Sequence, residues 1–169
     1  MLYASVERNT DARDRQGKSV RDLTKDLKEY AEQTEQTTGI DTIQTQQTMS
    51  ILLSMGTKVQ DLKRVTAAFQ DMQAKTGMSM MMLARSWSRL SEMPEEALNS
   101  MSRVGLRLNK EMLEGMTVEQ QRIVVLEQLE KRFGGQAQVM YEAAGATGRL
   151  ETNIDNLGKA LGKVVVEGI

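Results

Sequence analysis

The stretch VQDLKRVTAAFQDMQAKTGMS, residues 59–79, decides the fold class of this chain. Its apolar residues recur every three or four positions, which places them on one face of an α-helix. Gly77 ends the pattern, because glycine tolerates the left-handed conformation that closes a helix. Ser79 can cap the next helix by accepting a hydrogen bond from its free N–H groups. The apolar face consists of Val59, Leu62, Val65, Ala68, Phe69 and Met72.

The triplet Gly77-Met78-Ser79 has two counterparts, Gly39-Ile40-Asp41 and Gly115-Met116-Thr117. Each joins a residue that ends a helix, an apolar residue that can pack across the joint and a cap for the next helix. The glycines stand at a constant interval of 38 residues, which is typical of stacked helical hairpins. Asn153-Ile154-Asp155 follows at the same interval, but inside the helix expected for the last segment. Few other positions repeat, so the interval alone does not establish a duplication.

Applied to the whole chain, these patterns predict an all-α fold of several short-to-medium amphipathic helices punctuated by glycine. The expected helices include 41–55, 59–76, 79–90, 94–104 and 118–133. Ile43 and Ile123 are expected on the buried faces of the first and last of these helices. The predicted helix joints are Gly39, Gly77, Gly105, Gly115, Gly134 and Gly135.

The two ends of the chain carry narrow apolar stripes at the three- and four-residue spacing of coiled coils. We expect residues 1–38 to form a polar N-terminal helix, coiled-coil-like or frayed, and 39–148 to form a compact multi-helix domain. Residues 149–169 should form a C-terminal amphipathic helix that continues in a longer parent protein. The candidate residues for contacts between copies are Leu23, Leu27, Tyr30, Leu150, Ile154, Leu157 and Leu161.

Composition narrows the classes of function. Apolar residues make up 40% of the chain and aromatic residues only 4%, so helices packed through Leu, Met, Ala and Val suit it best. Twenty-two basic and 23 acidic residues give a net charge of −1, which predicts no broad basic surface for nucleic acid. The chain contains no histidine and no cysteine, which excludes the commonest general base and thiolate chemistry. No apolar run reaches the ~20 residues of a membrane span.

Several residues invite a catalytic interpretation that simple packing explains better. Glu95 and Glu96 are adjacent, so their carboxylates diverge on a helix, and their place after Pro94 suits the positive end of a helix. Trp87 lies on an apolar helix face and is expected in the core. Gly134-Gly135 follows no predicted strand, unlike a phosphate-binding loop. We therefore expect no catalytic, cofactor-binding or metal-ligating residue.

The order of four blocks resembles a known family. They are Ala74-Lys75-Thr76-Gly77 followed by a helix, Pro94 opening a helix that ends in Ser102-Arg103-Val104-Gly105-Leu106, LEQLEKRFGGQA at 126–137, and GATGRL at 145–150 leading into NIDNLGKALG at 153–162. Their succession is similar to the helical domain found within the tail tape measure proteins of long-tailed bacteriophages and prophages. The resemblance begins at Thr38 and covers about three quarters of the chain.

The resemblance implies a structural protein that acts in tail assembly, sets tail length inside the tail tube and leaves ahead of the DNA during ejection. Implied partners are other copies of the chain and the tail tube, tail tip and assembly chaperone proteins, without a small-molecule substrate or a cofactor. The implied location is the tail lumen of the virion, and the bacterial host cytoplasm during assembly. Arg103, Arg107 and Lys110 could then touch DNA or an acidic tube wall, although a solvated cluster is the favoured interpretation.

Three hypotheses follow from the sequence. The first is the structural tape measure segment. The second is a soluble, α-solenoid-like adaptor that binds proteins next to the glycine joints, which a regular superhelix with a concave groove would favour. The third, a wall-degrading enzyme, is the least supported, because no block of this segment matches a hydrolase.

Overall fold

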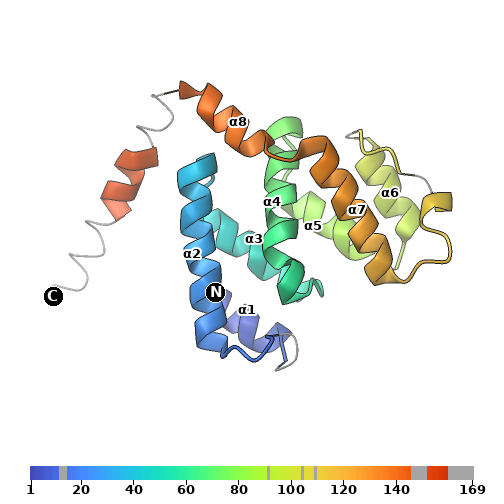
Figure 1. Cartoon of the computed structure of the whole chain (residues 1–169), viewed down its shortest axis with the longest axis horizontal. Helices are drawn as coiled ribbons and strands as arrows, with labels where there is room; N and C mark the ends of the chain where they lie inside the picture. The colour runs from blue at the N-terminus through green and yellow to red at the C-terminus, as the bar shows by residue number, and fades with distance from the viewer. Residues whose placement is uncertain (12–14, 91, 104, 109, 146–151, 160–169) are drawn as a thin grey trace.

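The computed structural model describes residues 1–11, 15–90, 92–103, 105–108, 110–145 and 152–159. Within these residues the chain forms helices and no strand (Figure 1), which confirms the predicted all-α, glycine-punctuated fold. The elements are α1 (Leu2–Asn9), α2 (Val20–Thr38), α3 (Thr42–Ser54), α4 (Val59–Thr76), α5 (Met80–Arg89), α6 (Pro94–Ser102), the 3₁₀ helix η1 (Lys110–Met112), α7 (Val118–Phe133) and α8 (Gln136–Ala143).

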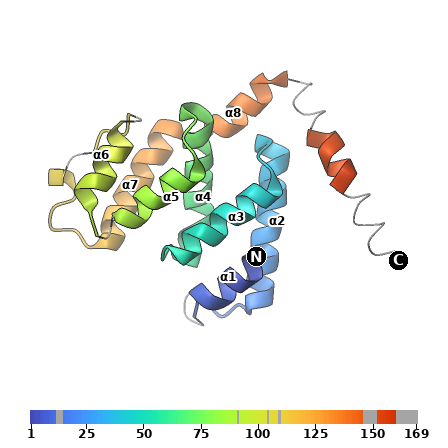
Figure 2. The ribbon, with the colours of Figure 1, turned by 180° about the vertical axis from the view of Figure 1, so that it is seen from behind.

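Helix α4 is the centre of the arrangement, in contact with α3, α5, α7 and α8. On one side α1 packs against α2 and α3, and on the other α5 packs against α6 (Figures 1 and 2). Helices far apart in the sequence therefore meet, as α2 and α8 do. In a solenoid each repeat contacts only its neighbours. The described part of the chain is thus a multi-helix fold and differs from the regular superhelix of the adaptor hypothesis.

The core forms around an aromatic pair on the inner faces of α4 and α5. The rings of Phe69 and Trp87 meet edge to face, with centroids 5.8 Å apart and planes at 84°. Both side chains are almost fully buried. The indole N–H of Trp87 donates to the Thr57 hydroxyl at 3.1 Å, so its polar group is satisfied. The same buried cluster includes Met49, Leu52, Leu62, Val65, Met72, Leu83, Leu90, Ala97, Leu126 and Leu129, among others.

The joints at Gly39 and Gly77 are nearly identical in atomic detail. Both glycines are left-handed, with φ of +69° and +72°, and end α2 and α4. In each joint the preceding threonine, Thr38 or Thr76, donates its hydroxyl to the carbonyl four residues back at 2.7 Å. The same oxygen accepts the N–H two residues further on at 3.3 Å. The threonine thus supports the turn from a helix end into the next helix.

The caps that follow the glycines start the next helices. Asp41 accepts hydrogen bonds from the N–H groups of two residues in the first turn of α3. Ser79 caps α5, and Thr117 forms a complete capping box with Gln120 at the start of α7. The fold therefore uses all three triplets as joints, although Gly115 follows the turn after η1 rather than a long helix.

The N-terminal segment differs from the expected polar, frayed helix. Residues 2–9 form α1, whose Leu2 and Val6 are 2% and 0% exposed because they pack into the core. Conversely, Ile43 and Ile123, expected inside, are 58% and 47% exposed. In α3 the polar face carrying Thr45 is buried instead.

The buried polar face of α3 is satisfied by a partner from α4. The Gln70 amide donates to the Thr45 hydroxyl at 2.8 Å, and both side chains are buried. A buried polar group is tolerated when it is hydrogen-bonded in this way. Apolar periodicity alone cannot identify such a face.

Candidate functional site

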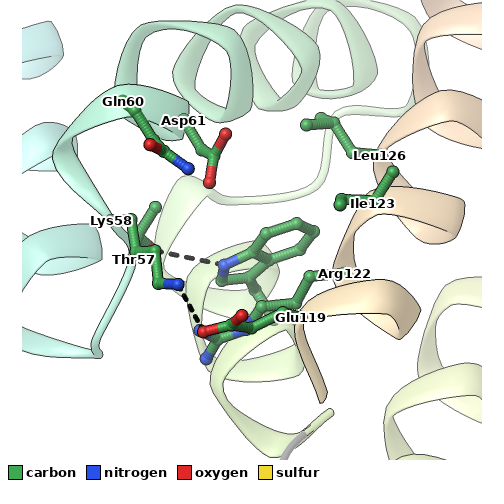
Figure 3. Close-up of a pocket in the computed structure, with 9 residues that line it drawn as sticks. Thr57, Lys58, Gln60, Asp61, Glu119, Arg122, Ile123 and Leu126 are labelled. Carbon is green, nitrogen blue, oxygen red and sulfur yellow. Dashed lines mark hydrogen bonds and ion pairs between the residues drawn. The ribbon is translucent and has the colours of Figure 1, made fainter. Parts of the chain in front are cut away.

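The most enclosed hollow described in this chain lies between the starts of α4 and α7, and Trp87 forms part of its lining. Figure 3 shows the labelled residues of α4 and α7 around it. It has a volume of about 110 Å³. Lys58 and Asp61 approach it from the start of α4, and Glu119 and Arg122 from the start of α7. The remaining lining residues are Thr57, Gln60, Trp87, Ile123 and Leu126.

Two of the charged groups of this Trp87 pocket pair with each other. Lys58 forms an ion pair with Glu119 that links the first turns of α4 and α7. The hydrogen bond and charge of the Lys58 ammonium keep the pKa of the Glu119 carboxyl below its ordinary value. A general acid at neutral pH needs the opposite, a raised pKa. The pair links the starts of α4 and α7, but 43% and 63% of its two side chains are exposed, so it adds little to stability.

Arg122, beside Glu119 at the start of α7, also lines the Trp87 pocket (Figure 3). Its guanidinium carbon lies 5.8 Å from the centre of the Trp87 ring, and Nη1 donates to the Gly56 carbonyl oxygen at 3.0 Å. Burial lowers the pKa of the Arg122 guanidinium, while the charges of Glu119 and Asp61 oppose this change. Cation–π contact and hydrogen bond together fix α7 over the core tryptophan.

These contacts limit what the Trp87 pocket can do. Ligand sites for drug-sized molecules usually measure roughly 300–1,000 Å³, several times this volume. Trp87 is 2% exposed, so its ring offers no open face on which a base or a sugar could stack. The pocket has room for one small group held by polar contacts. In the residues that the structure describes, no set of three or more acidic side chains could hold a metal ion.

Leu23, Leu27 and Tyr30, which were expected to contact another copy of the chain, pack in or against the core of the same chain. Leu23 and Leu27 are 5% and 1% exposed and pack inside the fold, so neither is available to a second copy. Tyr30 donates its hydroxyl to the Lys63 carbonyl oxygen at 3.0 Å, and the Lys63 ammonium lies 5.5 Å from its ring centre. Burial raises the pKa of the Tyr30 hydroxyl. The stripe on α2 is therefore a seam within one chain.

The described residues of the C-terminal set expected to contact another copy are exposed. Residues 152–159 are helical, and Ile154 and Leu157 are 58% and 63% exposed. Figures 1 and 2 show this helix beside α2, apart from the other helices. Leu150 and Leu161 lie outside the described residues. Of the described residues, Leu23 and Leu27 are buried and Ile154 and Leu157 are exposed, so these parts of the two stripes do not pack together.

The sequence patterns did not predict a salt bridge that links residues 152–159 to the joint at Gly39. The Lys159 ammonium donates to Asp41 at 2.6 Å and to Glu35 at 3.1 Å. Glu35 is 6% exposed, and a buried carboxylate requires such a partner. More than a hundred residues separate Lys159 from both acids, so no local spacing rule could indicate the contact.

A second long-range contact forms the start of α8. Gly134 ends α7, and Gly135 has a φ of +77°. No side chain of this segment caps α8. Instead the Asp71 carboxylate of α4 accepts the N–H groups of Gly135 and Ala137, both at 2.9 Å. The double-glycine joint is thus fixed by a cap from another helix.

Comparisons with known proteins found no relative of this chain. No family model matches the chain, and neither the curated proteins nor the solved structures contain a match to it. The helices of the described part are all too short or too polar to span a bilayer. A functional assignment therefore has to come from the order of the sequence blocks and from the surfaces described above.

Proposed function

We propose that this chain is a structural segment of a phage or prophage tail tape measure protein. It would act in tail assembly and length determination inside the tail tube, and in genome ejection. The observation that carries the proposal is the succession of the blocks 74–77, 94–106, 126–137 and 145–162, whose order and spacing resemble those of the helical domain in such proteins. The partners would be other copies and the tail tube, tail tip and chaperone proteins, in the host cytoplasm and then in the tail lumen.

The physical character of the molecule is compatible with this role. The described residues form helices, glycine joints and interhelical ion pairs, and two contacts at the Trp87 pocket, Lys58 with Glu119 and Arg122 with the Gly56 carbonyl, join α7 to the segment just before α4. Exposed apolar residues such as Ile154 and Leu157 offer contact surface for assembly. A helical ruler works through length, because each helical residue adds 1.5 Å along its axis.

The test is an in-frame deletion of the codons for residues 39–148 in the genome that encodes the chain. Electron microscopy should show tails that are shorter by up to about 1.5 Å for each deleted residue. Replacement of the deleted part by an unrelated helical sequence of equal length should restore the length. Particles that assemble with tails of unchanged length after the deletion would exclude a ruler function.

A soluble helical adaptor that binds proteins is the second candidate. One observation favours it: α1 to α7 share a continuous buried core, so the fold needs no tube wall for support. The gene neighbourhood and the deletion distinguish the two candidates. An adaptor predicts a stable complex with a soluble partner and no change in any tail, whereas a tape measure segment predicts a very long parent reading frame beside tail-tube genes.

A further inference from the structure

A second hollow opens where the Gly105 joint faces the last turns of α7. Its volume is about 410 Å³, within the range typical of ligand sites. We name it the basic hollow, and its lining consists of Gly105, Leu106, Arg107, Gln128, Lys131 and Arg132. Half of these residues are cations, and none is an acid.

The three cations reach the basic hollow from two separate segments. Lys131 and Arg132 belong to the last turn of α7, where cations also suit the negative end of the helix. Arg107 lies on the chain between α6 and η1, so the helix end does not account for its position. All three residues are exposed, and within the described residues none of them forms an ion pair.

Lys110, which the sequence places in the same basic cluster, lies outside the hollow and forms an ion pair with Glu95.

Arg132, by contrast, is held at the wall of the hollow. It packs its guanidinium against the backbone of Gly105, where a Cβ would lie only 2.6 Å from Nη2. Gly105 has a φ of +89°, so a glycine there both makes the turn and leaves room for Arg132. The local fold thus positions a charged side chain at the wall of the hollow.

We infer that the basic hollow is a docking site for an acidic protein segment that presents two or more carboxylates. Arginine forks bind carboxylates through paired hydrogen bonds, and the hollow presents two arginines and a lysine without a competing acid. Nucleic acid fits less well, since no aromatic side chain lines the hollow for base stacking and the chain as a whole carries a charge of −1. This inference goes beyond the proposed function and does not depend on it.

Fluorescence anisotropy of a short, fluorescein-labelled oligoglutamate peptide tests the site with the full chain at low salt. The triple variant Arg107→Gln/Lys131→Gln/Arg132→Gln should bind the peptide about tenfold more weakly. The control variant Arg21→Gln/Lys28→Gln/Lys75→Gln changes the net charge equally at exposed positions outside the hollow, and it should bind like the wild type. The double variant Arg107→Gln/Lys131→Gln keeps the Arg132 contact with Gly105 and should also lose affinity.

Each other result overturns the inference. Equal losses in the hollow and control variants would show that only net charge attracts the peptide. A labelled oligothymidylate that binds the wild type more tightly than oligoglutamate does, and that loses affinity in the triple variant, would make the hollow a nucleic-acid site. Failure of the wild type to bind oligoglutamate at low salt would remove the docking site altogether. Circular dichroism melting of all the variants shows whether the fold is kept.

Discussion

The glycines at positions 39 and 77 share one backbone conformation but have different surroundings. A Cβ on Gly39 would lie 2.6 Å from the ring of Tyr141 in α8, whereas a Cβ on Gly77 would meet nothing within 4 Å. Gly77→Ala should therefore lower the free energy of unfolding by about 1–2 kcal/mol, the cost of a left-handed alanine. Gly39→Ala should cost more, because the Tyr141 ring has to move as well.

Urea unfolding of the two variants measures this difference, with Gly77→Ala as the matched control. Truncation of the ring tests the cause: the extra cost of Gly39→Ala should shrink in a Tyr141→Ala background. Equal destabilisation in the two single variants would mean that α8 does not pack on the first joint.

At the residue scale, the sequence was informative where the decisive bonds are local. Gly39, Asp41, Ser79 and Thr117 act within a few residues of themselves, so their types and order predict their roles. Asp71 differs from these residues, because it accepts the N–H group of Gly135, 64 residues later in the chain, at the start of α8. Such a bond exists only after α4 and α8 have met, so sequence patterns cannot indicate it.

At the scale of elements, the Lys159 bridge makes the position of residues 152–159 depend on pH. Partial burial alone would raise the pKa of Asp41, but hydrogen bonds from Lys159 and from the N–H groups of Gln44 and Ile43 outweigh it and lower the pKa. The stabilisation is therefore complete above the ordinary value of 3.8 and is lost as the pH falls through the folded value. The pKa of Lys159 is raised, so the ammonium stays charged throughout this range.

We expect NMR relaxation of residues 152–159 to report faster motion once Asp41 is protonated in acid. Lys159→Gln should produce the same motion already at neutral pH, and Lys75→Gln, which removes an exposed charge elsewhere, should not. High salt should act in the same direction, because more than a third of the Lys159 side chain is exposed and screening weakens the pair. Relaxation that is unaffected by Lys159→Gln would show that the bridge does not hold this helix.

At the scale of the whole molecule, the helices could be predicted but their arrangement could not. The apolar stripe of α2 is compatible with a neighbouring copy or with the same chain, and only the packed fold assigns Leu23 and Leu27 to the core. The small apolar set of α1 gave no signal, because Leu2 and Val6 make too short a stripe to indicate burial. The way α7 packs on α4 also decides which of its apolar residues are buried. Val125 is 0% exposed, whereas Ile123, two residues earlier, is 47% exposed.

The same assignment fixes where copies of the chain can meet. Ile154 and Leu157 remain exposed at a heptad-like spacing with Leu150 and Leu161, so we expect self-association through the C-terminal helix. Sedimentation should show oligomers at high concentration, and Leu157→Glu should shift them to monomer without a change in melting temperature. Leu27→Glu, the control, should unfold the monomer itself because it buries an unpaired charge. A stable monomer at high concentration, unaltered by Leu157→Glu, would contradict self-association through this stripe.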